Sequence, residues 1–261
     1  MEFFNSVIIF FAGLWAGTIN SVVGSGTLVT FPVLIALGFA PVTASISNAT
    51  GLVAGNAAGA WGYRRELAGR RKQLLRLLPA SLLGGITGAY LLLNLPEKVF
   101  HYAAPALIVL ALLLVVFQPR LQRWVKDREQ NPEHALRDRS HGALLTVLVY
   151  LAGVYGGYFV AAQGILLVGI LGVFMTGTMQ NANAMKNVLV LGVNVVAAIS
   201  YLLFAFDRIE WGVVGLIAVS SLIGGVVGSK VGRRLHPAVL RGVIFTLGLV
   251  ALGFLIANLL K

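Results

Sequence analysis

The sequence predicts an all-α polytopic membrane protein made of two related halves. Of its 261 residues, 58% are hydrophobic and only 11% are charged, whereas soluble proteins carry about 25% charged residues. Long stretches contain no charged residue at all, namely 99–117, 143–185 and 212–229. A helix needs about 20 apolar residues to span a bilayer. The chain therefore has room for six full spans and several shorter apolar pieces.

Glycines repeat at a fixed offset along the chain. A shift of 140 positions superposes six glycines of the first half on six of the second: Gly13, Gly17, Gly24, Gly84, Gly85 and Gly88 on Gly153, Gly157, Gly164, Gly224, Gly225 and Gly228. The residues around them agree as well, since 12–15 resembles 152–155 and 81–85 resembles 221–225. Self-similarity at one offset predicts an internal duplication.

We expect each half to contain the same elements in the same order. A first apolar segment (3–19, then 143–159) leads into a polar break (20–26, then 161–164), and a short apolar piece follows (28–37, then 165–175). Three full spans complete each half, at 43–63, 73–95 and 99–117, then at 183–206, 211–229 and 238–260. The polar stretch 118–141 is expected to link a first membrane repeat, 1–117, to a second, 142–261.

The basic residues predict how the chain is oriented. Of the 20 lysines and arginines, 16 lie in the three stretches 64–76, 118–141 and 230–241. Because short cytoplasmic loops collect lysine and arginine, we expect these stretches on the cytoplasmic side of the plasma (inner) membrane and both termini outside. They share one side only if each broken segment is a re-entrant hairpin, which predicts inverted repeats. Residues Met1–Phe4 carry no basic n-region, so we expect no cleaved signal peptide.

The two helix breaks are the first candidate site. Broken helices in corresponding positions of inverted repeats are typical of transporters, whose substrate lies between half-helix N-termini. The first amides of a helix lack intrahelical partners and carry a positive dipole end, which suits an oxyanion. A glycine kink that packs against a neighbouring helix is the alternative interpretation. The breaks contain Asn20, Ser21, Gly24, Ser25, Gly26 and Thr27, then Gln163 and Gly164.

Lys186 is the second candidate feature. Apart from Arg76 and Arg241, which lie in the first turn of their spans, it is the only charged residue inside any expected span, and none of the nine carboxylates lies in one. A charge in a membrane helix normally faces a cavity, a partner or the interface, so an anionic ligand is the expected partner. Steps of three and four residues place Asn187 and Asn194 on the same helix face, with Asn48 and Asn56 as their counterparts in the first half. A lysine that reaches the inner surface and asparagines that only join helices are the alternatives.

Further residues complete a recognisable pattern. In the first half, Leu28, Pro32 and Gly38 follow the break, and a segment rich in small and polar residues follows at 44–50. In the second half, the corresponding pattern consists of the segments 153–159 and 161–164, followed by 183–187 and Asn194. The whole chain except 118–141 resembles the TauE/SafE sulfite-exporter family of membrane permeases. The family implies movement of sulfite, sulfonates or related organosulfur anions, commonly outward. The first glycine run is shortened here, and Val160 stands where glycine is common.

We therefore expect a secondary transporter that moves a small oxyanion, sulfite or a sulfonate, outward by alternating access. We expect it to interact with that anion and with the lipid bilayer, and with no nucleic acid, cofactor or metal ion. The sequence is compatible with either a monomer or a homodimer. An anion channel, a permease for another organic anion and uptake instead of export also stay open. A sensor with a Schiff base on Lys186 is disfavoured because no carboxylate counter-ion is found, and a membrane enzyme because no nucleophile–base pair is found.

Overall fold

The computed structural model describes residues 2–129, 142–175, 178–231 and 237–259, and within these residues all regular structure is helical. The helices are α1 (Phe3–Val22), α2 (Thr27–Ala36), α3 (Pro41–Gly62), α4 (Arg71–Asn94), α5 (Glu97–Glu129), α6 (Gly142–Phe159), α7 (Gln163–Phe174), α8 (Met179–Phe204), α9 (Trp211–Val231) and α10 (Pro237–Leu259), with 3₁₀ turns η1 (Arg64–Leu67) and η3 (Phe206–Arg208). Six of the described helices, α1, α4, α5, α6, α8 and α9, are long and apolar enough to cross a membrane. The prediction of an all-α multi-pass membrane protein is confirmed.

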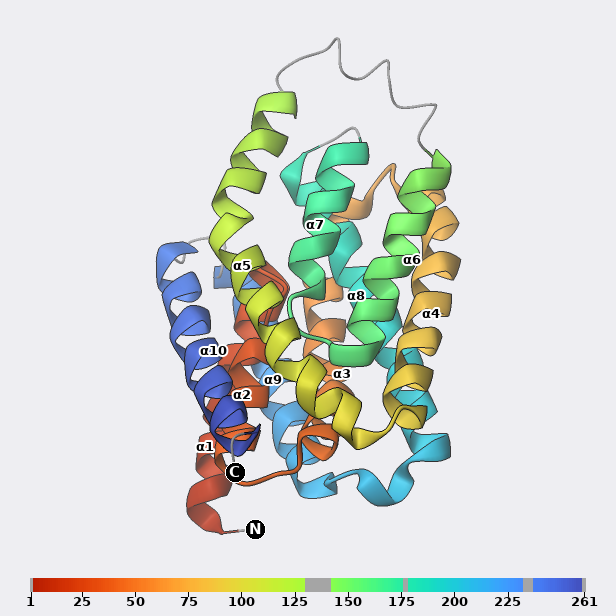
Figure 1. Ribbon diagram of the computed structural model, residues 1–261. Coiled ribbons are helices and arrows are strands. Elements are labelled where there is room, and N and C mark those ends of the chain that lie inside the picture. Colours follow the sequence, from red (N-terminus) through yellow and green to blue (C-terminus); the bar gives the residue numbers. More distant parts are fainter. Residues whose placement is uncertain (1, 130–141, 176–177, 232–236, 260–261) are drawn as a thin grey trace.

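The two broken segments form hairpins that start from opposite ends of the molecule. Helix α1 starts at the end where both termini lie, and α2 turns back to that end (Figure 1). Helix α6 starts at the other end, and α7 turns back to it (Figure 1). The turns of the two hairpins meet at mid-height. The predicted inverted relation of the two halves stays a prediction.

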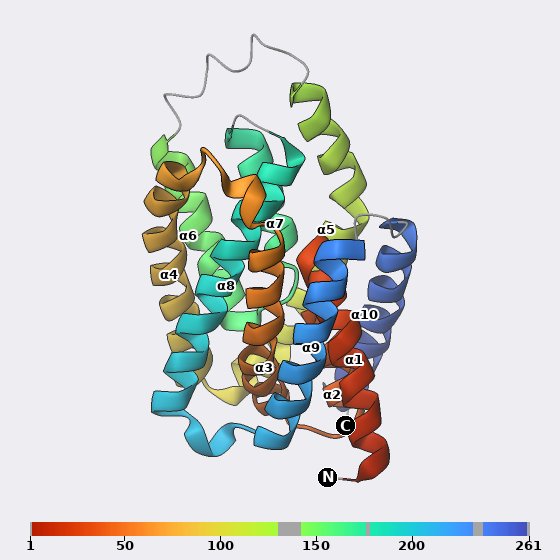
Figure 2. The ribbon, with the colours of Figure 1, turned by 180° about the vertical axis from the view of Figure 1, so that it is seen from behind.

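The structure differs from the predicted spans at α3. This helix has 22 residues but is too polar to count among the six apolar candidates. It lies between α8 and α9 in the reverse view (Figure 2) and packs against both. A helix enclosed by other helices does not need an apolar surface all round, and its polar side chains Ser45, Asn48 and Asn56 are buried.

Helix α5 extends beyond the predicted span 99–117 into the predicted linker. The helix continues from Phe117 to Glu129, so the first part of 118–141 is helical, and 130–141 lie outside the described residues. The polar residues after Phe117 are mostly good helix formers, such as Arg, Gln, Lys and Glu. Their polarity marks the end of the apolar span and not the end of the helix.

Each half packs its first helix against the other half. Helix α1 runs along α9, and α6 runs along α4. A Cβ added to Gly17 would lie 2.7 Å from the Cα of Ser221, and one added to Gly153 would lie 2.6 Å from the carbonyl oxygen of Ser81. Since real Cβ atoms do not approach so closely, both positions require glycine. The superposed glycines therefore allow the close contacts that make the halves one body.

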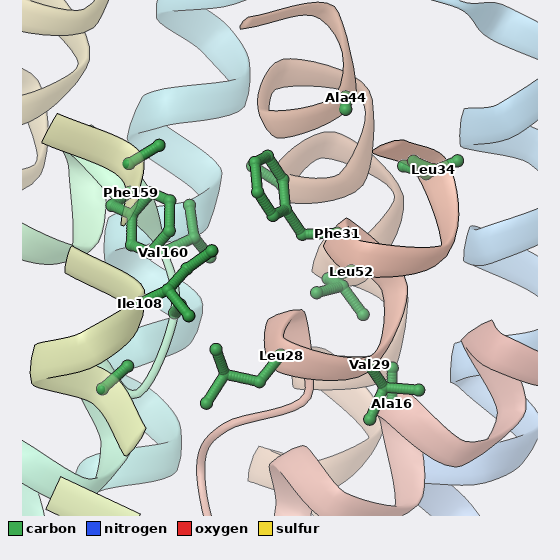
Figure 3. Packing of buried hydrophobic residues seen from close by; sticks show 14 of the residues in the cluster. Ala16, Leu28, Val29, Phe31, Leu34, Ala44, Leu52, Ile108, Phe159 and Val160 are labelled. Carbon is green, nitrogen blue, oxygen red and sulfur yellow. The ribbon is translucent and has the colours of Figure 1, made fainter. Parts of the chain in front are cut away.

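An apolar cluster joins the two hairpins beside their turns. Phe31 of α2 points towards Phe159 and Val160 of the second hairpin, with Ile108 of α5 alongside (Figure 3). The rings of Phe31 and Phe159 lie edge to face with centroids 5.5 Å apart, an arrangement that adds about 0.5–1.5 kcal/mol to the burial of the two rings. The cluster holds α2 against the second hairpin.

Candidate functional site

The two helix breaks contact each other through their glycines. The amide of Gly164 donates to the carbonyl oxygen of Gly24 at 3.1 Å. A Cβ on Gly24 would lie 2.6 Å from the Cα of Gly164, so the contact requires two glycines. Gly24 also adopts φ +89°, which glycine enters readily and other residues do not. These two residues are equivalent under the 140-residue offset, and they meet where the two hairpins turn.

The second break holds strained backbone in residues that are not glycine. Val160 has φ 66° and Ala162 has φ 58°, and both side chains are buried. A left-handed conformation costs an L-residue roughly 1–2 kcal/mol, and it is a genuine outlier for a β-branched side chain. Such strain clusters at ligand-binding and switch regions. The sequence signalled Val160 only as a departure from a glycine-rich pattern.

Lys186 of α8 lies at the junction of the two breaks. Its side chain is 0% exposed, and its Nζ donates to the backbone carbonyl oxygen of Asn20 at 3.0 Å. Its Cδ would lie 3.2 Å from a Cβ on Gly24 and 2.8 Å from one on Gly164. The side chain therefore touches both breaks, and the alternative of a lysine that reaches the inner surface is wrong.

No carboxylate neutralises this ammonium within the described residues. The hydrogen bond to Asn20 is its polar contact, and an ion pair formed elsewhere, Arg208 with Glu97 at 3.5 Å, lies at the surface. A buried charge without a counter-charge is costly, by several kcal/mol per ion. An ammonium has three donors, so the geometry leaves Lys186 with capacity for an anion.

Asn20 connects three elements around Lys186. Its Oδ1 accepts from the amide of Gly26 at 3.3 Å, which holds the start of α2 against the last turn of α1. Its Nδ2 donates to Oδ1 of Asn56 on α3. Asn20 and Ser21 were predicted to lie in the break, but α1 continues to Val22 and both belong to its last turn. Asn20, Gly24, Gly26, Gly164, Asn56 and Lys186 are thus linked by contacts, as expected of one site.

Asn48 and Thr27 form a separate cluster between α2 and α3. Oδ1 of Asn48 accepts from the hydroxyl of Thr30, and Nδ2 donates to Oγ1 of Thr27 at 3.2 Å. Both amide atoms therefore have protein partners. The sequence analysis did not single out Thr30, although it lies one helical turn after Thr27 and so on the same face.

Asn187 binds the end of α1. Its Nδ2 donates to the carbonyl oxygen of Ser21 at 3.3 Å, and Asn183 donates to the same oxygen at 3.5 Å. The last carbonyls of a helix lack intrahelical partners, so these amides act as a cap provided by α8. The Ser21 hydroxyl is also engaged, because it donates to the carbonyl oxygen of Thr18 at 2.9 Å.

Several buried polar atoms of the two breaks and of Asn56 have no hydrogen-bond partner. They are Oγ of Ser25, Nδ2 of Asn56, and both Oε1 and Nε2 of Gln163. Gln163 is 1% exposed and its amide lies against Gly156 of α6. A buried donor or acceptor left unpaired costs about 1–3 kcal/mol. These atoms therefore indicate a site that a polar ligand or water would satisfy.

Asn194 lies further along α8, on the same face as Lys186. It is 0% exposed, and both amide atoms lack a partner. Tyr201, two turns further along this face, donates to the carbonyl oxygen of Gly157 at 2.9 Å. Asn194 lies eight residues, about 12 Å along the helix, beyond Lys186.

Comparisons with known proteins point to one group of transporters. The family model described as "Sulfite exporter TauE/SafE" matches residues 9–255. "Probable membrane transporter protein YfcA" of Escherichia coli (strain K12) is 27% identical over 175 residues, 63% of this chain and 61% of that protein. The chain therefore spans about three fifths of the length of this relative.

Two other relatives match over more of their length. A "Probable membrane transporter protein" of Haemophilus influenzae is 25% identical over 223 residues, 85% of this chain and 83% of that protein. "Probable membrane transporter protein ORF9" of a Sinorhizobium species is 27% identical over 224 residues, 85% of this chain and 81% of that protein. No solved structure matches the chain.

Proposed function

Because the chain belongs to the sulfite exporter TauE/SafE family and is a multi-pass membrane transporter, we propose that it moves sulfite or a sulfonate outward across the plasma membrane by alternating access. The observation that carries this proposal is the buried ammonium of Lys186, which touches both helix breaks and has no carboxylate partner among the described residues. A visiting oxyanion supplies the missing counter-charge.

The oxyanion is held from both breaks at once. Lys186 provides the charge, and Ser25, Asn56 and Gln163 provide donors that have no partner in the protein. The amide of Gly164, a predicted donor, already binds the carbonyl oxygen of Gly24. Side chains and Lys186, not this amide, are therefore the contacts that we assign to the substrate in the closed state. Asn48 and Asn187 support the site by fixing α2 and the end of α1.

We further propose that the halves are inverted repeats, with both termini outside. The exchanged pairs α1 with α9 and α6 with α4 support this, as do the hairpins that start from opposite ends (Figure 1). The basic turn η1 and the start of α4 lie at the end away from the termini (Figure 1). That end is assigned to the cytoplasm because basic loops stay there.

The contact between Gly24 and Gly164 is the place where the two hairpins separate during transport. With Lys186 and Asn194 both 0% exposed, the described conformation is closed on both sides. The contact itself consists of backbone atoms of two glycines, and the apolar cluster of Phe31 and Phe159 beside it opens with it. Rocking of the group formed by the first hairpin and α9 against the group formed by the second hairpin and α4 then exposes the same site to either side in turn.

The membrane potential is sufficient to drive export. With a negative cell interior, each negative charge that leaves gains about 2.3 kcal/mol per 100 mV. Of the nine carboxylates, Glu97 alone falls in an apolar span of the described residues, at its first residue, where it pairs with Arg208 at the surface. No carboxylate deeper in a described span offers a route for proton coupling. A uniporter satisfies both observations.

Sulfite flux from proteoliposomes tests the proposal. The wild-type chain should give saturable flux, Lys186→Ala should reduce it at least about 100-fold because the site loses its only cation, and the exposed Lys98→Ala should keep it. Each variant is checked for folding by its elution and unfolding profile. Wild-type flux from folded Lys186→Ala would overturn the assignment, and flux without saturation would favour a channel.

A further inference from the structure

The charge that faces the junction of the two breaks is a single positive one. Lys186 is the one cation among the described residues that the contacts at the junction link, and the polar side chains of the two breaks and of Asn56 on α3 are neutral amides and a hydroxyl, those of Asn20, Ser25, Asn56 and Gln163. The other titratable groups of the elements packed against α8, and of α8 itself, are phenols and the charged residues of the helix ends and 3₁₀ turns. The phenols are those of Tyr63, Tyr90, Tyr102, Tyr150, Tyr155, Tyr158 and Tyr201. The charged residues are those of η1 (Arg64, Arg65 and Glu66), of η3 (Asp207 and Arg208), of both ends of α5 with His101, and of the first turns of α4, and no described carboxylate among them pairs with Lys186.

The helix dipoles add little to this charge. Each break joins the C-terminus of one helix to the N-terminus of the next, Val22 to Thr27 and Phe159 to Gln163. A helix end carries about half an elementary charge, positive at the N-terminus and negative at the C-terminus. The partial charges of the two helix ends at each break therefore largely offset one another. The net charge of the site is then that of the Lys186 ammonium.

The unpaired atoms at the junction also include acceptors. Gln163 leaves both its Nε2 and its Oε1 without a partner, and the hydroxyl of Ser25 can donate or accept. A fully deprotonated oxyanion offers only acceptors. A singly protonated one offers acceptors and one donor, so it can satisfy both atoms of the Gln163 amide.

From the single charge we infer that the site takes monoanions and excludes dianions, so that the species carried is hydrogensulfite or a sulfonate and not the sulfite dianion. The unpaired acceptor favours hydrogensulfite of these two, because a sulfonate has no proton to donate. This inference rests on the proposed function. A dianion leaves one negative charge uncompensated in a site where Lys186 is 0% exposed. That excess charge should weaken its binding at least about 100-fold relative to a monoanion of the same shape.

Ligands of fixed charge test the inference on the purified wild-type chain. Methanesulfonate is a monoanion and sulfate a dianion throughout the range from about pH 6 to about pH 8.5, whereas hydrogensulfite loses its proton within it. Dissociation constants are measured for all three from ligand-dependent thermal shifts. The decisive quantity is the ratio of the affinity for total sulfite to the affinity for methanesulfonate at each pH, because any titration of Lys186 itself affects both ligands equally.

The inference predicts that methanesulfonate binds at least about 100-fold more tightly than sulfate. It also predicts that the sulfite-to-methanesulfonate ratio falls about tenfold per pH unit once hydrogensulfite deprotonates. Sulfate that binds as tightly as methanesulfonate, or a ratio independent of pH, would overturn it. If neither sulfite nor a sulfonate binds at any pH, the proposed function itself fails, so the two failures are distinguishable.

A second cation at the site provides a gain-of-function test. Gln163→Lys places a second ammonium in the second break, next to Gly164, which Lys186 contacts, and should raise sulfate affinity at least about tenfold relative to methanesulfonate. Gln73→Lys on α4, which adds the same net charge away from the junction, should leave both affinities unchanged. A folded Gln163→Lys protein without any gain for sulfate contradicts the charge argument. If that variant does not fold, the wild-type ligand series still decides.

Discussion

Replacing Lys186 by methionine should stabilise the protein while it abolishes transport. Methionine fills a similar volume without charge, and the several kcal/mol cost of burying an unpaired ammonium disappears. The substitution also loses the hydrogen bond of 3.0 Å to the Asn20 carbonyl oxygen, and bonds from charged donors contribute about 1.5–3 kcal/mol. The net expectation is a gain of about 1–2 kcal/mol in the free energy of unfolding.

Thermal unfolding in detergent measures this gain. For a chain of this size, 1 kcal/mol shifts Tm by about 2–4 °C, so Lys186→Met should unfold about 2–8 °C above the wild type. The buffer must lack sulfite and sulfonates, because a bound anion stabilises the wild type and hides the difference. Lys98→Met, at an exposed position, is the matched control and should not shift Tm. A lower Tm for Lys186→Met would show that the lysine stabilises the fold, and would refute the reasoning.

Three further variants test the surroundings of the site. Gly164→Ala places a Cβ 2.5 Å from the Cα of Gly24 and should lower Tm by about 3–8 °C. The control Gly215→Ala, whose Cβ would have no atom within 4 Å, should not lower Tm. Equal Tm shifts in the two variants would contradict the contact between the breaks. Asn48→Ala leaves two α2 hydroxyls unpaired and should lower the free energy of unfolding by about 2–4 kcal/mol without changing the methanesulfonate Kd. A large change in Kd at unaltered stability would instead show that Asn48 binds the anion directly. Because the chain has no cysteine, a single introduced cysteine reports on which side of the membrane its position lies. Lys98→Cys should react with an impermeant maleimide on intact cells, and Arg70→Cys only after permeabilisation. The reverse pattern would contradict the proposed topology.

The positions of the helix breaks could be predicted from the sequence because glycine is a local signal. Gly24 and Gly164 were recognised as equivalent by their offset, and both lie at turns of hairpins. Their mutual contact could not be predicted from the sequence, because it depends on how two segments 140 residues apart pack. The same limit applied to Lys186, whose burial followed from its isolation among apolar residues. The hydrogen-bond acceptor of Lys186 is a backbone carbonyl in the other half, and no side-chain pattern in the sequence indicates it.

The asparagines show what helical periodicity does not determine. It placed Asn48 and Asn187 correctly on inward faces, but the neighbour that each meets depends on three-dimensional packing. Asn48 pairs with two threonines of α2, and Asn187 caps α1. Val160 is the converse case: its φ of 66° is imposed by the tertiary structure against its own preference. The extension of α5 was missed because polarity was used to mark the end of a helix.

Equilibrium binding of isotope-labelled sulfite to the purified wild type and Lys186→Ala tests the central claim most directly. If the buried ammonium between the two breaks holds the oxyanion, the wild type binds sulfite saturably, chloride does not displace it, and Lys186→Ala binds at least about 100-fold more weakly. Equal affinity in the two proteins, or equally effective displacement by chloride, would contradict the assignment of Lys186 as the residue that holds the transported anion.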